Sequence, residues 1–166
     1  MTEVVVSDTS PLQYLHQSGT LGLLPTLFAR VIVPPAVLGE LAEGRARGHE
    51  LPMLDAMPWV EIRAPITPLS LPAKLGRGEQ EAISVAAELH LPVLIDDRDA
   101  RSCAGSLGLK VIGIFGVLIK AKRQGLIPAV MPVADRIAGL GFRMNEATRQ
   151  QVRAVAGESG PGDPAG

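Results

Sequence analysis

Short apolar runs alternate with helix-like segments along most of the chain. The runs that predict strands lie at residues 3–7, 30–33, 59–63, 93–95 and 109–112. The runs at 4–6 and 92–95 are almost wholly apolar, which is typical of strands buried on both faces of a parallel sheet. The run at 59–63 alternates apolar and charged residues, so it predicts a half-exposed edge strand.

Apolar residues at helical spacing predict helices between and after these strands. Ser10 followed by Pro11 predicts a first helix with Ser10 as its N-cap. The remaining expected helices lie at 20–28, 36–43, 50–56 (weak), 79–89, 98–107, 114–124, 129–140 and 145–156. Strands alternating with helices predict an α/β fold: a three-layer α/β/α sandwich with a mainly parallel central sheet.

The length of 166 residues suits one domain, expected at residues 1–157. Residues 158–166 are rich in Gly and Pro, which predicts a disordered tail. No stretch approaches the ~20 apolar residues that cross a bilayer, and the first residues carry no basic region. With a single cysteine, Cys103, no intrachain disulfide is possible, so a soluble cytoplasmic protein without a membrane segment is expected.

The composition limits the ways in which this chain could bind nucleic acid. Apolar residues make up 46% of the chain but aromatic residues only 3%, which predicts an aliphatic core and argues against binding by aromatic stacking. Because the formal net charge is −1, a polyanion site has to be a local patch. The basic candidates for RNA contact are Arg98, Arg101, Lys120, Lys122 and Arg123. The last three also have a structural explanation, since basic residues in a final helical turn complement the helix dipole.

Acidic residues follow two of the predicted strands. Asp8 comes directly after the first strand, and Asp96 and Asp97 follow the strand at 93–95. The carboxyl edge of an open parallel sheet is where such folds bind ligands. Two carboxylates ~5 Å apart at an effective dielectric of ~20 repel by roughly 3 kcal/mol, so a cluster of them requires protons or a cation.

Hard cations such as Mg²⁺ and Mn²⁺ prefer carboxylate oxygens and water as ligands. The three histidines, His16, His49 and His90, lie apart from one another and outside the acidic motifs. The sequence therefore favours oxygen ligands over a nitrogen or sulfur site.

Four motifs occur in a characteristic order: VSDTSPL at 6–12, GEQEAI at 78–83, IDDRDAR at 95–101 and VIGIFGVL at 111–118. In these motifs the chain resembles the PIN-domain superfamily, and within it the compact prokaryotic group of toxin-like ribonucleases. The resemblance extends over roughly residues 4–142.

The resemblance implies metal-dependent cleavage of RNA with Mg²⁺ or Mn²⁺, leaving a 5′-phosphate and a 3′-hydroxyl. It also implies the toxin role of a toxin–antitoxin pair, with a protein antitoxin as partner, and a homodimer. The family acids map onto Asp8, Glu40, Glu79 and Asp97, and the family hydroxyl maps onto Ser10, with Thr9 as the alternative. Competing acids for the last two positions are Glu81, Asp96 and Asp99.

Each acid also has a structural explanation, which keeps other functions open. Asp8 can satisfy the backbone of its turn, and Glu79 and Asp97 can cap helices. If all of them do only this, the chain is a catalytically degenerate PIN-like domain that binds RNA or a protein without cleavage. A phosphatase of the haloacid-dehalogenase type also has an Asp after its first strand, but it needs a second Asp two positions later, where this chain has Ser10.

Overall fold

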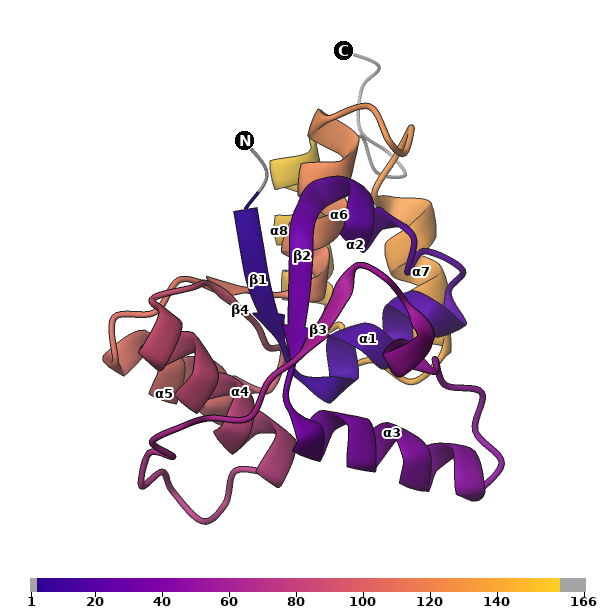
Figure 1. The fold of residues 1–166 in the computed structure, drawn as a ribbon. Coiled ribbons are helices and arrows are strands. Elements are labelled where there is room, and N and C mark those ends of the chain that lie inside the picture. The colour runs from indigo at the N-terminus through magenta and orange to yellow at the C-terminus, as the bar shows by residue number, and fades with distance from the viewer. Residues whose placement is uncertain (1–2, 159–166) are drawn as a thin grey trace. The chain divides into compact units, whose positions relative to one another are not determined.

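The computed structural model describes residues 3–158 (Figure 1). The chain divides into two compact units, residues 1–114 and residues 115–166. The first unit contains the whole sheet and every acidic motif. The prediction of one domain over residues 1–157 stays a prediction, and the predicted disorder of residues 159–166 lies outside the described part of the chain.

A five-stranded sheet forms the centre of the first unit. Its strands are β1 (Glu3–Ser7), β2 (Phe28–Val33), β3 (Val60–Ile62), β4 (Val93–Leu94) and β5 (Val111–Ile112). They lie in the order β3-β2-β1-β4-β5, and every neighbouring pair is parallel. The parallel sheet and the edge position of β3 confirm both predictions.

The helices of the first unit connect these strands. They are α1 (Thr9–Gln17), α2 (Leu23–Leu27), α3 (Pro35–Ala46), the 3₁₀ helix η1 (Leu54–Ala56), α4 (Arg77–Leu89) and α5 (Arg98–Ser106). The helix α6 (Ile114–Arg123) starts at the boundary, and α7 (Met131–Gly139) and α8 (Glu146–Ala156) belong to the second unit. No helix within residues 3–158 is long and apolar enough to span a membrane.

The core beneath α4 and α5 shows why the strands carry so many aliphatic residues. One face of the sheet packs against small and branched side chains of these two helices, in a cluster of Val6, Ile32, Leu75, Ala82, Ile83, Val85, Ala86, Val93, Ile95, Ala100 and Ala104. In β1, Val5 points to the opposite face and is also fully buried. Burial on both faces is the requirement that the apolar runs indicated.

Several helix bounds differ from their predictions, and the weak helix expected at 50–56 is only the 3₁₀ helix η1. Helix α1 begins at Thr9 with Asp8 in the N-cap position, so Ser10 is not the N-cap. Pro11 is accepted there because backbone N–H groups in the first turn have no helical partner. Helix α2 is shorter than the predicted 20–28 and starts only after Gly22. It ends at Leu27 because Phe28 already pairs with Glu3 in the sheet.

The Pro-rich connection from β3 to α4 is held along α4 by polar side chains one helical turn apart. Gln80 Nε2 donates to the Leu75 carbonyl at 2.7 Å, and Ser84 Oγ accepts from Leu69 N at 3.0 Å. One turn further, the Glu88 carboxylate accepts the N–H groups of Ile66 and Thr67. Without regular secondary structure, residues 66–75 are thus fixed to the helix that carries Glu79.

In the second unit, Glu158 binds the start of α7. Its two carboxylate oxygens accept from Val130 N at 2.7 Å and Met131 N at 2.9 Å. The Lys122 ammonium donates to Glu158 at 2.9 Å and to the Ala156 carbonyl at 2.7 Å. The prediction that the disordered tail begins at residue 158 is therefore wrong for Glu158, whose side chain is largely buried.

Replacing Glu158 tests the contribution of this contact to stability. Burial opposes ionisation of Glu158, but the N–H groups of Val130 and Met131 and the Lys122 ammonium outweigh it and lower its pKa. We expect Glu158→Gln to lower the free energy of unfolding by about 1–3 kcal/mol at pH 7, because a charge-assisted contact is lost. The loss should shrink as the pH falls through the pKa of Glu158, because the wild-type carboxylate is then protonated. Urea denaturation at pH 7 and pH 3.5 measures it, and equal stability of the two proteins at pH 7 would contradict the expectation.

Candidate functional site

The site lies where the strand order of the sheet reverses. The central strand β1 is followed along the chain by its neighbour β2 on one side, whereas β4 lies on its other side. Asp8 follows β1, and its N–H donates to the Leu94 carbonyl of β4 at 3.0 Å. Such a switch point leaves a crevice outside the carboxyl ends of the strands, the usual ligand position in open α/β sheets.

Asp8 is the most buried carboxylate at this edge of the sheet. It is only 3% exposed, and its Oδ1 is buried without a hydrogen-bond partner among the described residues. The pKa of Asp8 is raised to about 7, mainly by burial and also by Glu79, Glu40 and Asp96, while the Thr9 N–H lowers it in part. A buried oxygen without a donor, among other acids, is a position that a cation or a proton would stabilise.

Glu40 comes from α3 and is held by two other elements. Its Oε1 accepts from Gly78 N at 2.9 Å, and its Oε2 accepts from the Thr9 hydroxyl. A Cβ atom at Gly78 would lie 2.7 Å from Oε2 and 2.8 Å from Oε1, so glycine is required for this close approach. The hydroxyl that contacts an acid is thus that of Thr9, and the predicted role of Ser10 stays a prediction.

Glu79 and Asp97 lie at the starts of two helices. Glu79 Oε2 accepts from Gly76 N at 3.2 Å at the beginning of α4, and Asp97 Oδ2 accepts from Ala100 N at 2.9 Å as the N-cap of α5. The predicted capping by Asp97 is confirmed. The pKa of Glu79 is raised by burial first and then by Asp97, with a smaller contribution from Glu40, while the Gly76 N–H lowers it in part.

Asp96 is bound to the backbone on the other side of the edge. Both of its oxygens accept from Ile114 N, at 3.0 and 3.2 Å. Burial raises the pKa of Asp96 to about 6, against the lowering effects of the Ile114 N–H and the Arg101 guanidinium. Arg101 itself donates to the Ile95 carbonyl at 2.9 Å, and Gly113 leaves room for both side chains.

The electrostatic neighbours show which of the predicted acids come together. Asp8 interacts with Glu40, Glu79 and Asp96, and Glu79 interacts with Glu40, Asp97 and Asp99. Within residues 3–158, however, no group of three or more Asp, Glu, His or Cys side chains has the arrangement of a metal site. Most of these carboxylates instead accept backbone N–H groups.

Two of the alternative acids have other contacts. Glu81 Oε1 accepts from Ala36 N at 3.1 Å and so satisfies an N–H at the start of α3. Asp99 forms an ion pair with Lys74 at 3.3 Å, and both side chains are exposed. The acids that interact with Asp8 offer only oxygen ligands, and its buried Oδ1 has no partner within residues 3–158, so the chemistry of these side chains, though not their present arrangement, suits a hard divalent cation.

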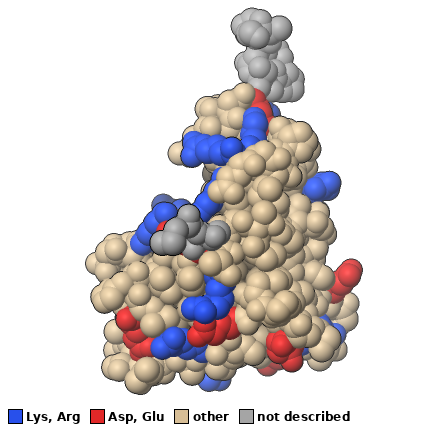
Figure 2. Space-filling model, turned by 45° about the horizontal axis from the view of Figure 1, so that its top comes forward, with Lys and Arg blue, Asp and Glu red and all other residues tan. Residues whose placement is uncertain are grey.

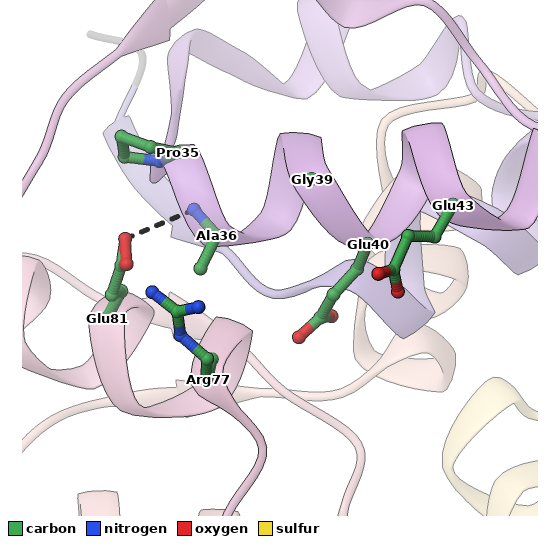
Figure 3. Close-up of a pocket in the computed structure, with 7 residues that line it drawn as sticks. All are labelled: Pro35, Ala36, Gly39, Glu40, Glu43, Arg77 and Glu81. Carbon is green, nitrogen blue, oxygen red and sulfur yellow. Dashed lines mark hydrogen bonds between the residues drawn. The ribbon is translucent and has the colours of Figure 1, made fainter.

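A cavity of about 440 Å³ opens beside Glu40 (Figure 3). It is lined by Pro35, Ala36, Gly39, Glu40, Glu43, Arg77 and Glu81. In the view of Figure 3 the Arg77 guanidinium lies between the side chains of Glu81 and Glu40. Sequence analysis missed Arg77, because a basic residue between two glycines carries no signal that distinguishes it from a loop residue in solvent.

The predicted RNA-binding residues are divided between the two units. Arg98 is exposed at the start of α5, Arg101 is bound to Ile95, and Lys122 is paired with Glu158 in the second unit. Lys120 and Arg123 also belong to that unit. On the face shown in Figure 2, acidic and basic side chains lie next to one another near the bottom of the view, as the near-zero net charge indicates.

Comparisons with known proteins agree with this architecture. The chain matches the family DUF3368, described as a PIN domain, over residues 4–158. It is similar in structure to a PilT N-terminus domain protein from the hyperthermophilic archaeon Sulfolobus solfataricus P2, with a TM-score of 0.51 and 22% sequence identity over 69% of this chain and 89% of that chain. No protein of curated function matches the chain. Because the family match extends over nearly the whole chain, the protein belongs to the PIN-domain superfamily.

Proposed function

We propose that this protein is a Mg²⁺- or Mn²⁺-dependent endoribonuclease. PIN domains are generally nucleases that use divalent metal ions. The observation that carries the proposal for this chain is the buried Oδ1 of Asp8, which has no hydrogen-bond partner within residues 3–158 and has three other acids in electrostatic contact. A structural turn residue would have used that oxygen to accept an N–H group.

Four acids would bind the cation in this proposal. Asp8 and Asp97 would hold the cation directly, and Glu40 and Glu79 would bind it directly or through water. When bound, the cation supplies positive charge to a scissile phosphate and activates water for attack. The Thr9 hydroxyl and Gly78 N–H set the direction of the Glu40 carboxylate, and the capping bonds of Glu79 and Asp97 fix those residues at rigid helix starts.

One set of contacts favours the alternative, a degenerate domain that binds without cleaving. Glu40, Glu79, Asp96 and Asp97 each accept at least one backbone N–H, as purely structural acids would. Asp8 Oδ1 does not fit that pattern, because nothing in the described structure satisfies it. The two functions therefore differ in whether Asp8 binds a cation or is purely structural.

The partners are proposed from the family resemblance. A toxin-like PIN domain would be inhibited by a protein antitoxin and would act as a homodimer in the cytoplasm. The test for the first is whether a neighbouring gene encodes a small protein that binds and inhibits this chain. Sedimentation of the purified chain tests the second.

RNA cleavage should depend on a divalent cation and on the acids of the site. With Mg²⁺ or Mn²⁺ the wild-type protein should cut RNA and leave 5′-phosphate ends, whereas EDTA, Asp8→Asn and Asp97→Asn should each lower the rate by at least about 100-fold, because charge on the transferred phosphate is no longer neutralised. Gel analysis of end-labelled RNA measures this. An exposed acid outside the site, Asp55→Asn, is the matched control and should cut like wild type. Equal cleavage in all samples would remove the mechanism.

The stability of the metal-free protein should depend on pH through Asp8. The folded pKa of Asp8 lies near 7, above its ordinary 3.8, so its contribution to stability is fully present below pH 4 and is lost as the pH rises through 7. Without divalent ions, Asp8→Asn should therefore be more stable than wild type at pH 8, by at most roughly 4 kcal/mol, and about equal to it near pH 4. Thermal unfolding across this pH range measures the difference.

Mn²⁺ supplies the control for that experiment. At pH 8 it should raise the Tm of the wild type, because it binds the folded state, and it should leave Asp8→Asn nearly unchanged. If Mn²⁺ shifts neither protein, or both alike, the degenerate domain is the better account.

Adding a Cβ atom at Gly78 tests whether its close approach to Glu40 matters for cleavage. Gly78→Ala should displace the Glu40 carboxylate and lower cleavage about tenfold or more, although alanine favours a helix by about 1 kcal/mol over glycine. Gly105→Ala in α5 is the matched control, because its added Cβ would meet nothing within 4 Å. It should be as active as wild type and slightly more stable, and equal activity of the two variants would show that the position of Glu40 is unimportant.

A further inference from the structure

Two cavities adjoin on either side of Arg77. The first, beside Glu40, is the one in Figure 3, and the second has a volume of about 430 Å³. Pro35, Arg77 and Glu81 line both of them. Each volume lies within the roughly 300–1,000 Å³ that is usual for small-ligand sites. A ligand that reaches the carboxylate site through Glu40 can therefore continue past Arg77 into the second cavity.

Arg77 is the basic residue in both linings. Within residues 3–158 its guanidinium has no hydrogen bond or ion pair, unlike Arg101, which is bound to the Ile95 carbonyl. The guanidinium is a planar fork that binds phosphate through two parallel hydrogen bonds. Glu40, Glu43 and Glu81 also line the first cavity, so a phosphate group there would depend on Arg77, which offsets one of their three charges.

The second cavity has a different chemistry. Its lining combines the apolar residues Pro35, Ala64, Pro65, Pro68 and Leu69 with the polar side chains of Arg77, Gln80, Glu81 and Ser84. Apolar side chains beside polar groups suit a nucleobase, whose faces are apolar and whose edges form hydrogen bonds. The cavity is also preformed, since Ser84 and Gln80 hold the segment from Leu69 to Leu75 against α4.

We propose that Arg77 binds a backbone phosphate next to the scissile one, and that the cavity lined by Pro65, Pro68 and Leu69 takes an adjacent unstacked base of a single-stranded RNA. This inference rests on the proposed ribonuclease function and assigns two further contacts to its substrate. A base inside a duplex is stacked and paired, so it cannot enter a side cavity, whereas single strands and loops can present one. The continuity with Glu40 and the unpaired guanidinium favour RNA over a peptide as the occupant.

Binding without cleavage provides the first test. In the non-cleaving Asp8→Asn background, a fluorescein-labelled 12-nucleotide single-stranded RNA of mixed sequence should bind, and Arg77→Ala should raise its Kd about tenfold or more. Arg77→Lys should restore part of the affinity. The slope of log Kd against log salt should fall by about 0.7 in Arg77→Ala, as expected for the loss of one phosphate contact with a single strand. Arg47→Ala, an exposed arginine outside both linings, should change neither quantity.

Leu69→Asp tests the base cavity separately, because it places a charge on the apolar wall while leaving Arg77 intact. It should weaken binding of the mixed-sequence strand at least fivefold but leave an abasic strand of the same length unaffected. Circular dichroism and thermal unfolding confirm that each variant is folded. Unchanged RNA binding in both Arg77→Ala and Leu69→Asp would overturn the proposal and leave the cavities to a protein ligand.

Cleavage by the otherwise wild-type protein separates this inference from the proposed function. With Mn²⁺, the single strand should be cut at least tenfold faster than the same sequence in a duplex, and Arg77→Ala should act mainly by raising KM. Cleavage of the duplex at an equal rate, or an Arg77→Ala variant with wild-type KM, would overturn the single-strand site while the nuclease function stood. No cleavage of any RNA would instead contradict the proposed function.

Discussion

The burial of the Asp8 carboxylate beside other acids is the constraint on which the structure of this edge depends. A pKa raised from 3.8 to about 7 corresponds to a penalty of roughly 4 kcal/mol on the charged form. That is a large share of the 5–15 kcal/mol by which ordinary domains are stable. The fold tolerates it because the neighbouring acids are bound individually: Glu40 by Gly78 and Thr9, Glu79 by Gly76, and Asp96 by Ile114. Among the described residues, Asp8 alone keeps a buried side-chain oxygen without a hydrogen-bond partner.

The parallel sheet explains why these acids meet although they are far apart in the chain. In the order β3-β2-β1-β4-β5, the carboxyl ends of β1 and β4 are neighbours, which brings Asp8 next to Asp96. The helices α3 and α4 contact each other, so Glu40 reaches Gly78 across the gap between them. Three side chains of α4 form hydrogen bonds with the backbone of the segment from Ile66 to Leu75. These bonds restrict the position of the first turn of α4. Each acid therefore stands on an element whose position is fixed by packing or by hydrogen bonds.

The sequence predicted the parts of this arrangement that depend on local rules. The aliphatic runs identified the strands, the alternation at 59–63 identified the edge, and Asp97 was recognisable as an N-cap. Local rules failed where a distant contact decides: Phe28 joins β2 because it pairs with Glu3, and Glu158 is ordered because it caps a helix that starts 27 residues earlier in the chain. The choice between Glu79 and Glu81 is of the same kind. Residues two positions apart on a helix are rotated by about 200°, so the side chains of Glu79 and Glu81 face opposite ways. Only the position of α3 shows which of the two faces Asp8.

Arg77 would give a protein of almost zero net charge a local positive group for a polyanion such as RNA. A general positive field would attract RNA everywhere, but with a net charge of −1 the attraction has to be local. A carboxylate cluster repels phosphate until a cation occupies it, so on the proposed function the metal ion and Arg77 would be the two positive charges that a substrate meets. The metal would act at the bond that is cut and Arg77 one phosphate away. Affinity for RNA would then depend on the metal as well as on the protein, and the metal-free protein, with its acids unneutralised, would bind its substrate through Arg77 but more weakly than the metal-bound protein.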